Sequence, residues 1–352
     1  MTERKRNLNL DLIRCAALLL VPAMHGIDNT GLYTIQLESA GDIVMMVLRI
    51  LFTDCIPLYI LLTGYLCNRK TPSLHYYLGY VRIYLTYLLC CIPSLLLEYY
   101  YKHSLTSISD LVGSVLNFYG NGYAWYIMMY TGLFIMIPFL NMMYHGCATK
   151  RQKQLLIAVF FALSILPSFL NLRFQIYSIW WRNLYPICYY FTGAYLSEYM
   201  PDIKAGKAGS ALLLFLGAYS LFFFFYYKGN GEELMNVYQT SWEVYILGVL
   251  TFIFLYKLRL DRLPGWMSAV LIKISDLTLF IYLLTWIPDG LTYPRMVLIA
   301  PEVGDRYIWL LVTVPIALVS ATLMALVMER IYRPLYSWIM KGLTKLLPGG
   351  KA

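Results

Sequence analysis

The chain has 352 residues, of which 60% are hydrophobic and only 13% are charged. Soluble domains carry about 25% charged residues, so this composition excludes an ordinary soluble protein and indicates a polytopic membrane protein. The net charge of +9 would suggest a nucleic-acid partner in a soluble protein, but in a membrane protein basic residues belong first to cytoplasmic loops. The seven cysteines form no CxxC pair and lie mostly in apolar runs, which argues against a disulfide framework and against a metal site.

Ten apolar runs come close to the roughly 20 residues that a helix needs to cross a bilayer. They lie at about 8–27, 43–66, 77–99, 124–143, 154–170, 184–200, 209–227, 241–258, 268–288 and 307–329. The expected fold is therefore all-α, with about ten transmembrane helices in a single membrane domain that covers residues 1–352. No internal repeat is evident, which disfavours transporter folds built from inverted halves.

The distribution of basic residues predicts the orientation of these helices. Most of the 28 lysines and arginines fall in the two termini and in the connections after the second, fourth, sixth and eighth runs. The densest groups lie at 4–6, 150–153 and 257–273. Because cytoplasmic loops carry the excess of Lys and Arg, both termini are expected in the cytoplasm. The expected location is the inner, cytoplasmic membrane of the cell.

One connection on the opposite side has a pattern of its own. Residues 107–119 (SISDLVGSVLNFY) place apolar side chains at the spacing of an amphipathic helix. Ser107 and Asp110 have the separation of a capping pair at its start. This segment is either an interfacial helix that walls a cavity or a simple surface connector.

The first apolar run carries three ionisable residues where hydrocarbon tolerates few, namely Asp11, Arg14 and His25. At about 100° and 1.5 Å per residue, the eleven steps from Arg14 to His25 return to nearly the same helix face about 16 Å further along. Arg14 either recognises a phosphate or carboxylate through its planar guanidinium or forms a structural ion pair with Asp11. His25 either acts as a general base or is an interface histidine with a satisfied ring.

Further charged residues lie in other apolar runs. Arg49 and Asp54, five residues apart in the second run, either form intramembrane pairs or contribute to binding an acceptor. Arg82, at the cytoplasmic start of the third run, either reaches lipid phosphate or helps to hold an anionic donor. Asp276, in the ninth run, has no role assigned from the sequence.

The segment DLIRCAALLLVPAMH (11–25) resembles the first helix of the acyltransferase 3 family of membrane acyltransferases, whose signature is an arginine, ten residues and a histidine. Other segments resemble the family in the same order along the chain. They are PLYILLTGYL (57–66), Arg82 with Ile83, LVGSVLNFYGNGYAWYI (111–127), Pro138, YPICYYFTGAYLSE (185–198) and SDLTLFIYLLTW (275–286). The sequence departs from the family at Thr63, where serine is usual, and at Thr285, where a histidine is common.

The resemblance implies an O-acyltransferase. It would move an acyl group, usually acetyl, from cytoplasmic acyl-CoA to a hydroxyl of a polysaccharide or lipid-linked glycan of the cell envelope. Acetyl-CoA would be a co-substrate, with no bound cofactor, and the other partners would be the glycan acceptor and the lipid bilayer, without nucleic acid. His25 would be the general base, Arg14 would act with it, and Arg14, Arg82 and Asp11 would bind the donor. The residues expected around the cavity or acceptor are Arg49, Asp54, Trp125, Tyr126 and Tyr282.

Two other classes of function remain open at this point. A transporter or exporter of a small polar solute or of a lipid-linked sugar would use the same intramembrane charges as a permeation path. A polymerase of lipid-linked glycans would be expected to carry long outer loops with several arginines, and the outer connections here are short. Release of free CoA distinguishes the acyltransferase from the transporter.

Overall fold

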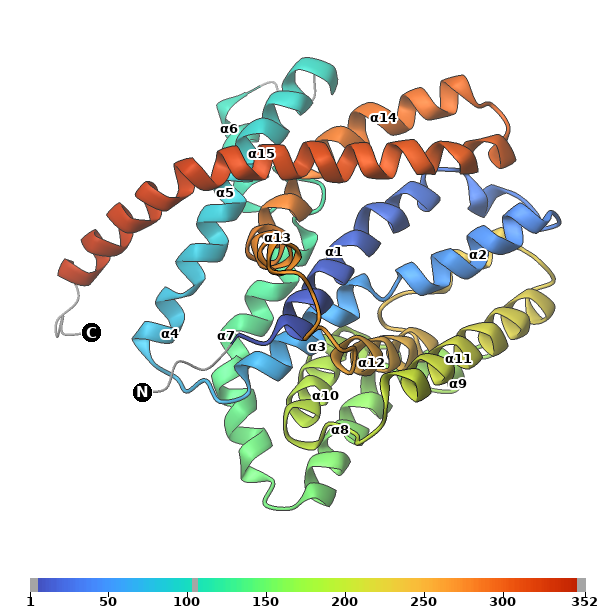
Figure 1. Cartoon of the computed structure of the whole chain (residues 1–352), viewed down its shortest axis with the longest axis horizontal. Helices are drawn as coiled ribbons and strands as arrows, with labels where there is room; N and C mark the ends of the chain where they lie inside the picture. The colour runs from blue at the N-terminus through green and yellow to red at the C-terminus, as the bar shows by residue number, and fades with distance from the viewer. Residues whose placement is uncertain (1–5, 103–106, 347–352) are drawn as a thin grey trace. The chain divides into compact units, whose positions relative to one another are not determined.

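The computed structural model describes residues 6–102 and 107–346, and every regular element in these ranges is helical (Figure 1). Residues 4 and 5, which contribute to the predicted orientation, lie outside the described residues. The chain divides into two compact units, each described by itself. Unit one comprises residues 1–71, 137–275 and 293–314, and unit two comprises residues 72–136, 276–292 and 315–352.

Within the described residues, seven helical segments are long and apolar enough to cross a membrane. They are Leu8–Asp28, Ala40–Cys67, Leu74–Tyr101, Trp125–Gly146, Ala205–Tyr226, Gly265–Leu284 and Val303–Lys345. They cover the first four, the seventh, the ninth and the tenth of the expected runs, so the all-α, multi-pass prediction is confirmed. The total of ten spans and the cytoplasmic termini stay predictions.

The three other runs lie in shorter helices. The fifth run is divided between α8 (Lys150–Ser164) and α9 (Leu166–Leu170). The sixth and eighth runs form α10 (Tyr185–Tyr199) and α12 (Trp242–Tyr256). With 15 residues each, α10 and α12 extend about 22 Å at 1.5 Å per residue, which is shorter than the hydrocarbon core of about 30 Å.

The second run is interrupted, which hydropathy alone does not predict. It forms α2 (Ala40–Phe52) and α3 (Cys55–Cys67), with Thr53 and Asp54 between them. Pro57 has no N–H and cannot bond the carbonyl of Thr53, four residues earlier, so the helical ladder is broken at this point. At the start of α2, the side chains of Ser39 and Asp42 form a reciprocal capping box.

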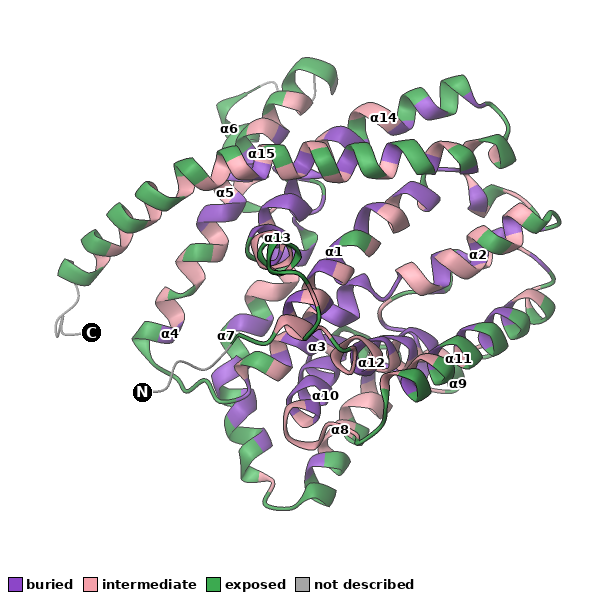
Figure 2. Ribbon diagram, in the orientation of Figure 1, coloured by how far each residue is buried: buried purple, intermediate pink, exposed green. Residues whose placement is uncertain are grey.

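Two glycines bring the backbones of α3 and α10 together in unit one. A Cβ atom on Gly64 would lie 2.0 Å from the carbonyl oxygen of Tyr190, and one on Gly193 would lie 2.0 Å from that of Leu61. Both glycines belong to the segments that resemble the family, 57–66 and 185–198. Small residues allow close helix packing in membranes, and Figure 2 colours most of α10 as buried.

The other helices of unit one surround this pair. Helix α3 also packs against α1 (Leu8–Asp28) and α12, and α12 packs against α11 (Ala205–Tyr226). The short helices η1 (Leu32–Thr34) and η4 (Gly231–Asn236) meet each other. An apolar core runs through this part of the unit, with Ile50, Phe223 and Leu247 among its fully buried members.

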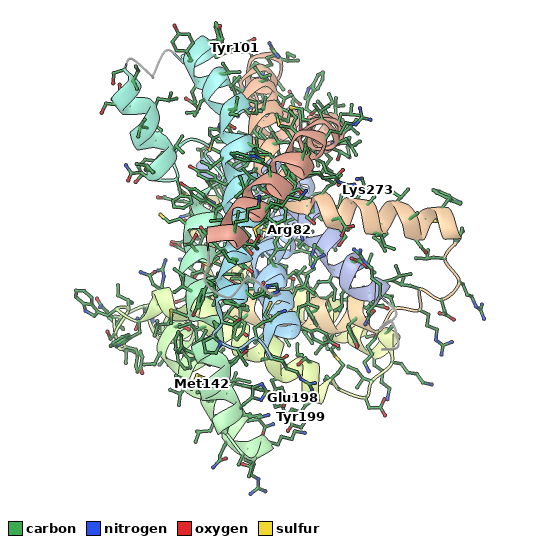
Figure 3. All side chains as sticks on the ribbon, turned by 90° about the vertical axis from the view of Figure 1, so that its left-hand side faces the viewer. Arg82, Tyr101, Met142, Glu198, Tyr199 and Lys273 are labelled. Atoms are coloured by element: carbon green, nitrogen blue, oxygen red, sulfur yellow. The ribbon has the colours of Figure 1, made fainter. Side chains whose placement is uncertain are left out.

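Lys153 of α8 is not a simple loop cation, although its position contributes to the predicted orientation. Its side chain is 10% exposed, and its Nζ lies 2.5 Å from Oε2 of Glu198 on α10 and 4.5 Å from the ring centre of Tyr144. Glu198 and Tyr199 are labelled at this end of α10 in Figure 3. The ion pair therefore anchors α8 to α10.

Unit two contains α4 (Leu74–Leu78), α5 (Tyr80–Leu97), a π-helical turn (Glu98–Lys102) and α6 (Ile108–Leu116). Parts of α7 (Trp125–Gly146), α13 (Gly265–Leu284), α14 (Trp286–Ile299) and α15 (Val303–Leu346) complete it. Helix α6 confirms the amphipathic prediction for 107–119, and the Ser107 hydroxyl accepts a bond from the Asp110 N–H.

The region after the ninth run differs from the expectation. No apolar run is predicted between the ninth and tenth runs, and the structure has α14 from Trp286 to Ile299 there. Thr285 separates α13 from α14, and its hydroxyl donates a hydrogen bond to the backbone carbonyl of Tyr282 in the preceding turn. A side chain that bonds nearby backbone carbonyls competes with regular helix geometry.

Candidate active site

The residues in the N-terminal half of α1 form a small polar network in unit one. The Arg14 Nη1 atom donates to the Ser275 hydroxyl over 2.9 Å, and that hydroxyl donates to Asp11 Oδ1 over 2.6 Å. The direct Arg14 to Asp11 separation is 3.9 Å. The structure therefore brings Asp11 and Arg14 together as predicted, with Ser275 bridging them.

Arg6 is the main partner of Asp11. Its Nε and Nη2 atoms donate to the two carboxylate oxygens over 2.8 Å and 2.7 Å, the bidentate geometry that makes the strongest guanidinium–carboxylate pairs. Both carboxylate oxygens of Asp11 are thus hydrogen-bonded. Arg14 makes one hydrogen bond, to Ser275, and one long ion pair, to Asp11. A guanidinium has five N–H donors, so Arg14, with 29% of its side chain exposed, retains donors for an anionic ligand.

His25 lies one turn from the other end of the same helix. Its side chain is half-buried, and its backbone carbonyl accepts bonds from the N–H and the side-chain amide of Asn29 at the helix end. The adjacent Gly26 faces Leu310 of α15, and a Cβ atom there would lie 3.0 Å from the Leu310 side chain. Close packing against α15 therefore fixes the turn that presents the imidazole.

A buried ion pair follows directly after His25. Arg49 of α2, 3% exposed, donates through Nε to Asp28 Oδ1 over 2.6 Å and to the Tyr33 hydroxyl over 2.8 Å. The Tyr33 hydroxyl also donates to Asp28, and Arg49 donates to the hydroxyl of Thr53. Burial raises the pKa of the Tyr33 phenol, so it remains a hydrogen-bond donor at neutral pH.

Arg49 and Asp54 do not pair with each other. Five residues correspond to about 140° around a helix, so the two side chains face different neighbours. Asp54 is fully buried, and its Oδ2 accepts a bond of 2.6 Å from the Thr251 hydroxyl of α12. Arg49 is thus paired with a carboxylate of another helix, whereas the partner of Asp54 is a neutral hydroxyl.

The predicted residues of unit two form two separate groups. Arg82 (labelled in Figure 3) is exposed and lines a cavity of about 300 Å³. Arg333 lines the same cavity and is paired with Glu329 over 2.7 Å. Asp276, without an assigned role in the sequence, lies there too, together with Tyr332. The cavity lining thus contains two guanidinium groups, which attract an anion, and two carboxylates, which offset their positive charge.

Trp125, Tyr126 and Tyr282 are brought together by the structure. The rings of Tyr126 and Tyr282 lie 5.8 Å apart at 73°, and those of Trp125 and Tyr126 lie 6.3 Å apart at 88°. The Tyr282 hydroxyl donates to the backbone carbonyl of Tyr123 over 2.7 Å. Tyr126 and Tyr282 are buried, whereas Trp125 is 37% exposed, so Trp125 is the member that a ligand can reach directly.

A family model described as an acyltransferase domain matches residues 7–330, nearly the whole chain. The chain belongs to the acyltransferase 3 family. The match covers all the site residues described above except Arg6, Tyr332 and Arg333. Comparisons with curated proteins and with solved structures each give no match.

The acyltransferase contains three polar partners that the sequence did not reveal. Arg6 contributes only to the predicted orientation, Asp28 lies just past the first expected run, and Ser275 is 261 residues from Arg14. The position of Arg6, five residues before Asp11, was an available signal. Nothing in the local sequence indicates that Ser275 or Arg49 would meet α1, because those contacts depend on helix packing.

Proposed function

We propose that this membrane acyltransferase transfers an acetyl group from cytoplasmic acetyl-CoA to a hydroxyl of an extracytoplasmic or lipid-linked glycan in the inner membrane. The observation that carries the proposal is the continuity of α1 from Leu8 to Asp28. A single helix keeps Arg14 and His25 on nearly one face, about 16 Å apart along the axis. One end is suited to an anionic donor and the other to proton transfer.

Arg14 is proposed as a contact for the donor phosphates. Its guanidinium is partly exposed and keeps free hydrogen-bonding capacity because Arg6 neutralises Asp11. Planar, bidentate donors match phosphate geometry. Arg82 is proposed as a further phosphate contact, supported by its exposure and by the open cavity beside it.

His25 is proposed as the general base. Its imidazole removes the proton from the acceptor hydroxyl while that oxygen attacks the thioester carbonyl carbon. The carbon–sulfur bond then breaks, and the departing CoA sulfur takes the proton from the imidazolium. The products are the glycan ester and free CoA, so atoms and charge balance without another reactant. Trp125 and Tyr126 are proposed to contact the acceptor, supported by the exposure of Trp125.

Mass spectrometry of surface glycans tests this proposal in cells. Cells that produce the protein should carry one acetyl increment per modified sugar, and cells without it should lack that increment. His25→Ala and Arg14→Ala variants that reach the membrane at normal levels should also lack it. His75→Ala and Arg69→Ala are matched controls, since both residues are exposed and lie outside the proposed site. Full acetylation by both site variants would show that the site assignment is wrong.

A further inference from the structure

Unit one contains a cavity that the proposed acyl transfer does not use. Its volume is about 340 Å³, within the range of small-molecule sites, which begins at about 300 Å³. Its walls come from α9, η3 (Arg182–Leu184), the C-terminal end of α11, η4 and the start of α12. These segments surround the N-terminal end of α12, where Trp242 and Glu243 are the first two residues.

Aromatic rings form two walls of this cavity at nearly a right angle. The rings of Trp242 and Tyr219 lie 5.6 Å apart at 87°, and Tyr227, Tyr238 and Phe222 also line the space. The face of an aromatic ring carries partial negative charge, so ring faces along a cavity wall attract a cation placed against them. An arrangement of this kind is used by proteins that recognise ammonium groups.

A buried carboxylate lies beside these rings. Glu243 is 4% exposed, and its Oε1 accepts a bond of 2.9 Å from the Tyr219 hydroxyl. Among the residues that the structure describes, none forms an ion pair with Glu243. A carboxylate buried without a positive partner is unfavourable, and a bound cation would remove that penalty.

The remaining charges in the cavity keep it acidic. Glu233 of η4 lines the wall, and Arg182, which is exposed, is the one basic residue among those lining the cavity. Two carboxylates against one guanidinium disfavour an anionic ligand. A bare metal cation would need several oxygen ligands in place of aromatic faces, so an organic cation fits this lining better.

The walls are held in place by hydrogen bonds between residues that line the cavity. The Trp242 N–H donates to the Ser168 hydroxyl of α9 over 2.9 Å, and the Ser241 hydroxyl donates to the backbone carbonyl of Asn236 over 3.1 Å. A site whose walls are fixed in advance loses less entropy on binding. The cavity also adjoins α2, because the backbone carbonyl of Val237 in its wall accepts a hydrogen bond of 3.5 Å from Arg49 Nη1.

We propose that this cavity binds an organic ammonium group against its aromatic wall of Trp242 and Tyr219, with the Glu243 carboxylate as its counter-charge. A quaternary ammonium of the choline type and the primary ammonium of an amino sugar both supply that chemistry. The inference does not depend on the acyl donor or on His25, so it stands or fails separately from the proposed acyl transfer.

Binding to the full-length protein in lipid nanodiscs tests this inference, with no acyl donor present. The probes are choline and glucosamine, each compared with an uncharged counterpart of similar shape, 3,3-dimethylbutan-1-ol and glucose. At least one amine should bind, and about tenfold more tightly than its neutral counterpart. Binding of choline alone or of glucosamine alone identifies which ammonium source the cavity accepts.

Two variants locate the site. Glu243→Gln and Trp242→Leu should each weaken binding of the amine about tenfold or more. Glu232→Gln is the matched control, because Glu232 is exposed in the same short helix and does not line the cavity, and it should bind like the wild type. Absence of binding by both amines, or equal binding of an amine and its neutral counterpart to the wild-type protein, would overturn the inference even if a variant failed to fold.

Discussion

Arg49 and Asp28 form an ion pair of 2.6 Å that joins α2 to the last turn of α1, three residues after His25. The two partners differ in burial, since the Arg49 side chain is 4% exposed and that of Asp28 is 29% exposed. The Tyr33 hydroxyl forms hydrogen bonds with both members of the pair. The turn that presents His25 is therefore held by a pair whose cation is enclosed and whose carboxylate still reaches water.

This difference in burial predicts unequal effects of removing each partner. Asp28→Asn leaves a buried guanidinium without its counter-charge, and we expect a loss of about 3 kcal/mol in the free energy of unfolding. Arg49→Met leaves a carboxylate that water can solvate, so the loss should be smaller. Denaturation of both variants in the same detergent measures the order. A larger loss for Arg49→Met would contradict the burial argument.

The contact between α3 and α10 predicts that side chains at the two glycines are not tolerated. Gly64→Ala or Gly193→Ala places a methyl group 2.0 Å from a backbone oxygen of the facing helix. The backbones must separate, so we expect a loss of about 3 kcal/mol or more. Gly217→Ala in α11 is the control, because a Cβ there has nothing within 4 Å. Thermal unfolding and the yield of folded protein report the difference, and equal stability of all three variants would contradict it.

The network around Asp11 predicts a rescue experiment. In Arg6→Ala, Asp11 loses its bidentate partner and competes for Arg14, so the KM for acetyl-CoA should rise about tenfold, the equivalent of one charge-assisted hydrogen bond of about 1.5 kcal/mol. The value of kcat should change little. Adding Asp11→Asn removes the competing carboxylate and should restore most of the affinity. Steady-state kinetics of the single and double variants decide this, and a double variant no better than Arg6→Ala would argue against the assignment.

The capping box of α2 predicts a smaller effect on stability. Ser39→Ala removes the side-chain oxygen that accepts from the Asp42 N–H over 3.1 Å, and loss of such a cap costs about 1 kcal/mol. Ser210→Ala is the control, because Ser210 is exposed inside α11 and alanine is the better helix former there. Unfolding of both variants should show a loss only for Ser39→Ala. An unchanged midpoint for that variant would mean that the cap does not limit the stability of the unit.

Much of the fold can be predicted from the sequence because hydropathy and helix periodicity are local properties. They predict α1, the apolar runs and the amphipathic helix α6 with its Ser107 cap. They do not predict the break between α2 and α3, where the effect of Pro57 competes with a continuous apolar pattern. They also do not predict α14, most of which lies between the ninth and tenth runs.

The candidate site shows the same division. The spacing of Arg14 and His25 on one helix follows from the sequence, since both belong to one apolar run. The partners of these charges do not, because Arg49 reaches Asp28 across 21 residues and Arg14 reaches Ser275 across 261. Such pairs depend on which helices pack together, and hydropathy carries no information about packing partners. The sequence assigns no role to Glu243, near the start of the eighth apolar run, for the same reason.

His25 is proposed to perform the proton transfer in acyl transfer from CoA. The most direct measurement is the rate of free CoA release by the purified protein in nanodiscs, with acetyl-CoA and a glycan acceptor present. The wild type and the His75→Ala control should release CoA in step with acetylation of the acceptor. His25→Ala should lose at least about a hundredfold in that rate, the usual contribution of a general base. Near wild-type release by a correctly folded His25→Ala variant would contradict the claim.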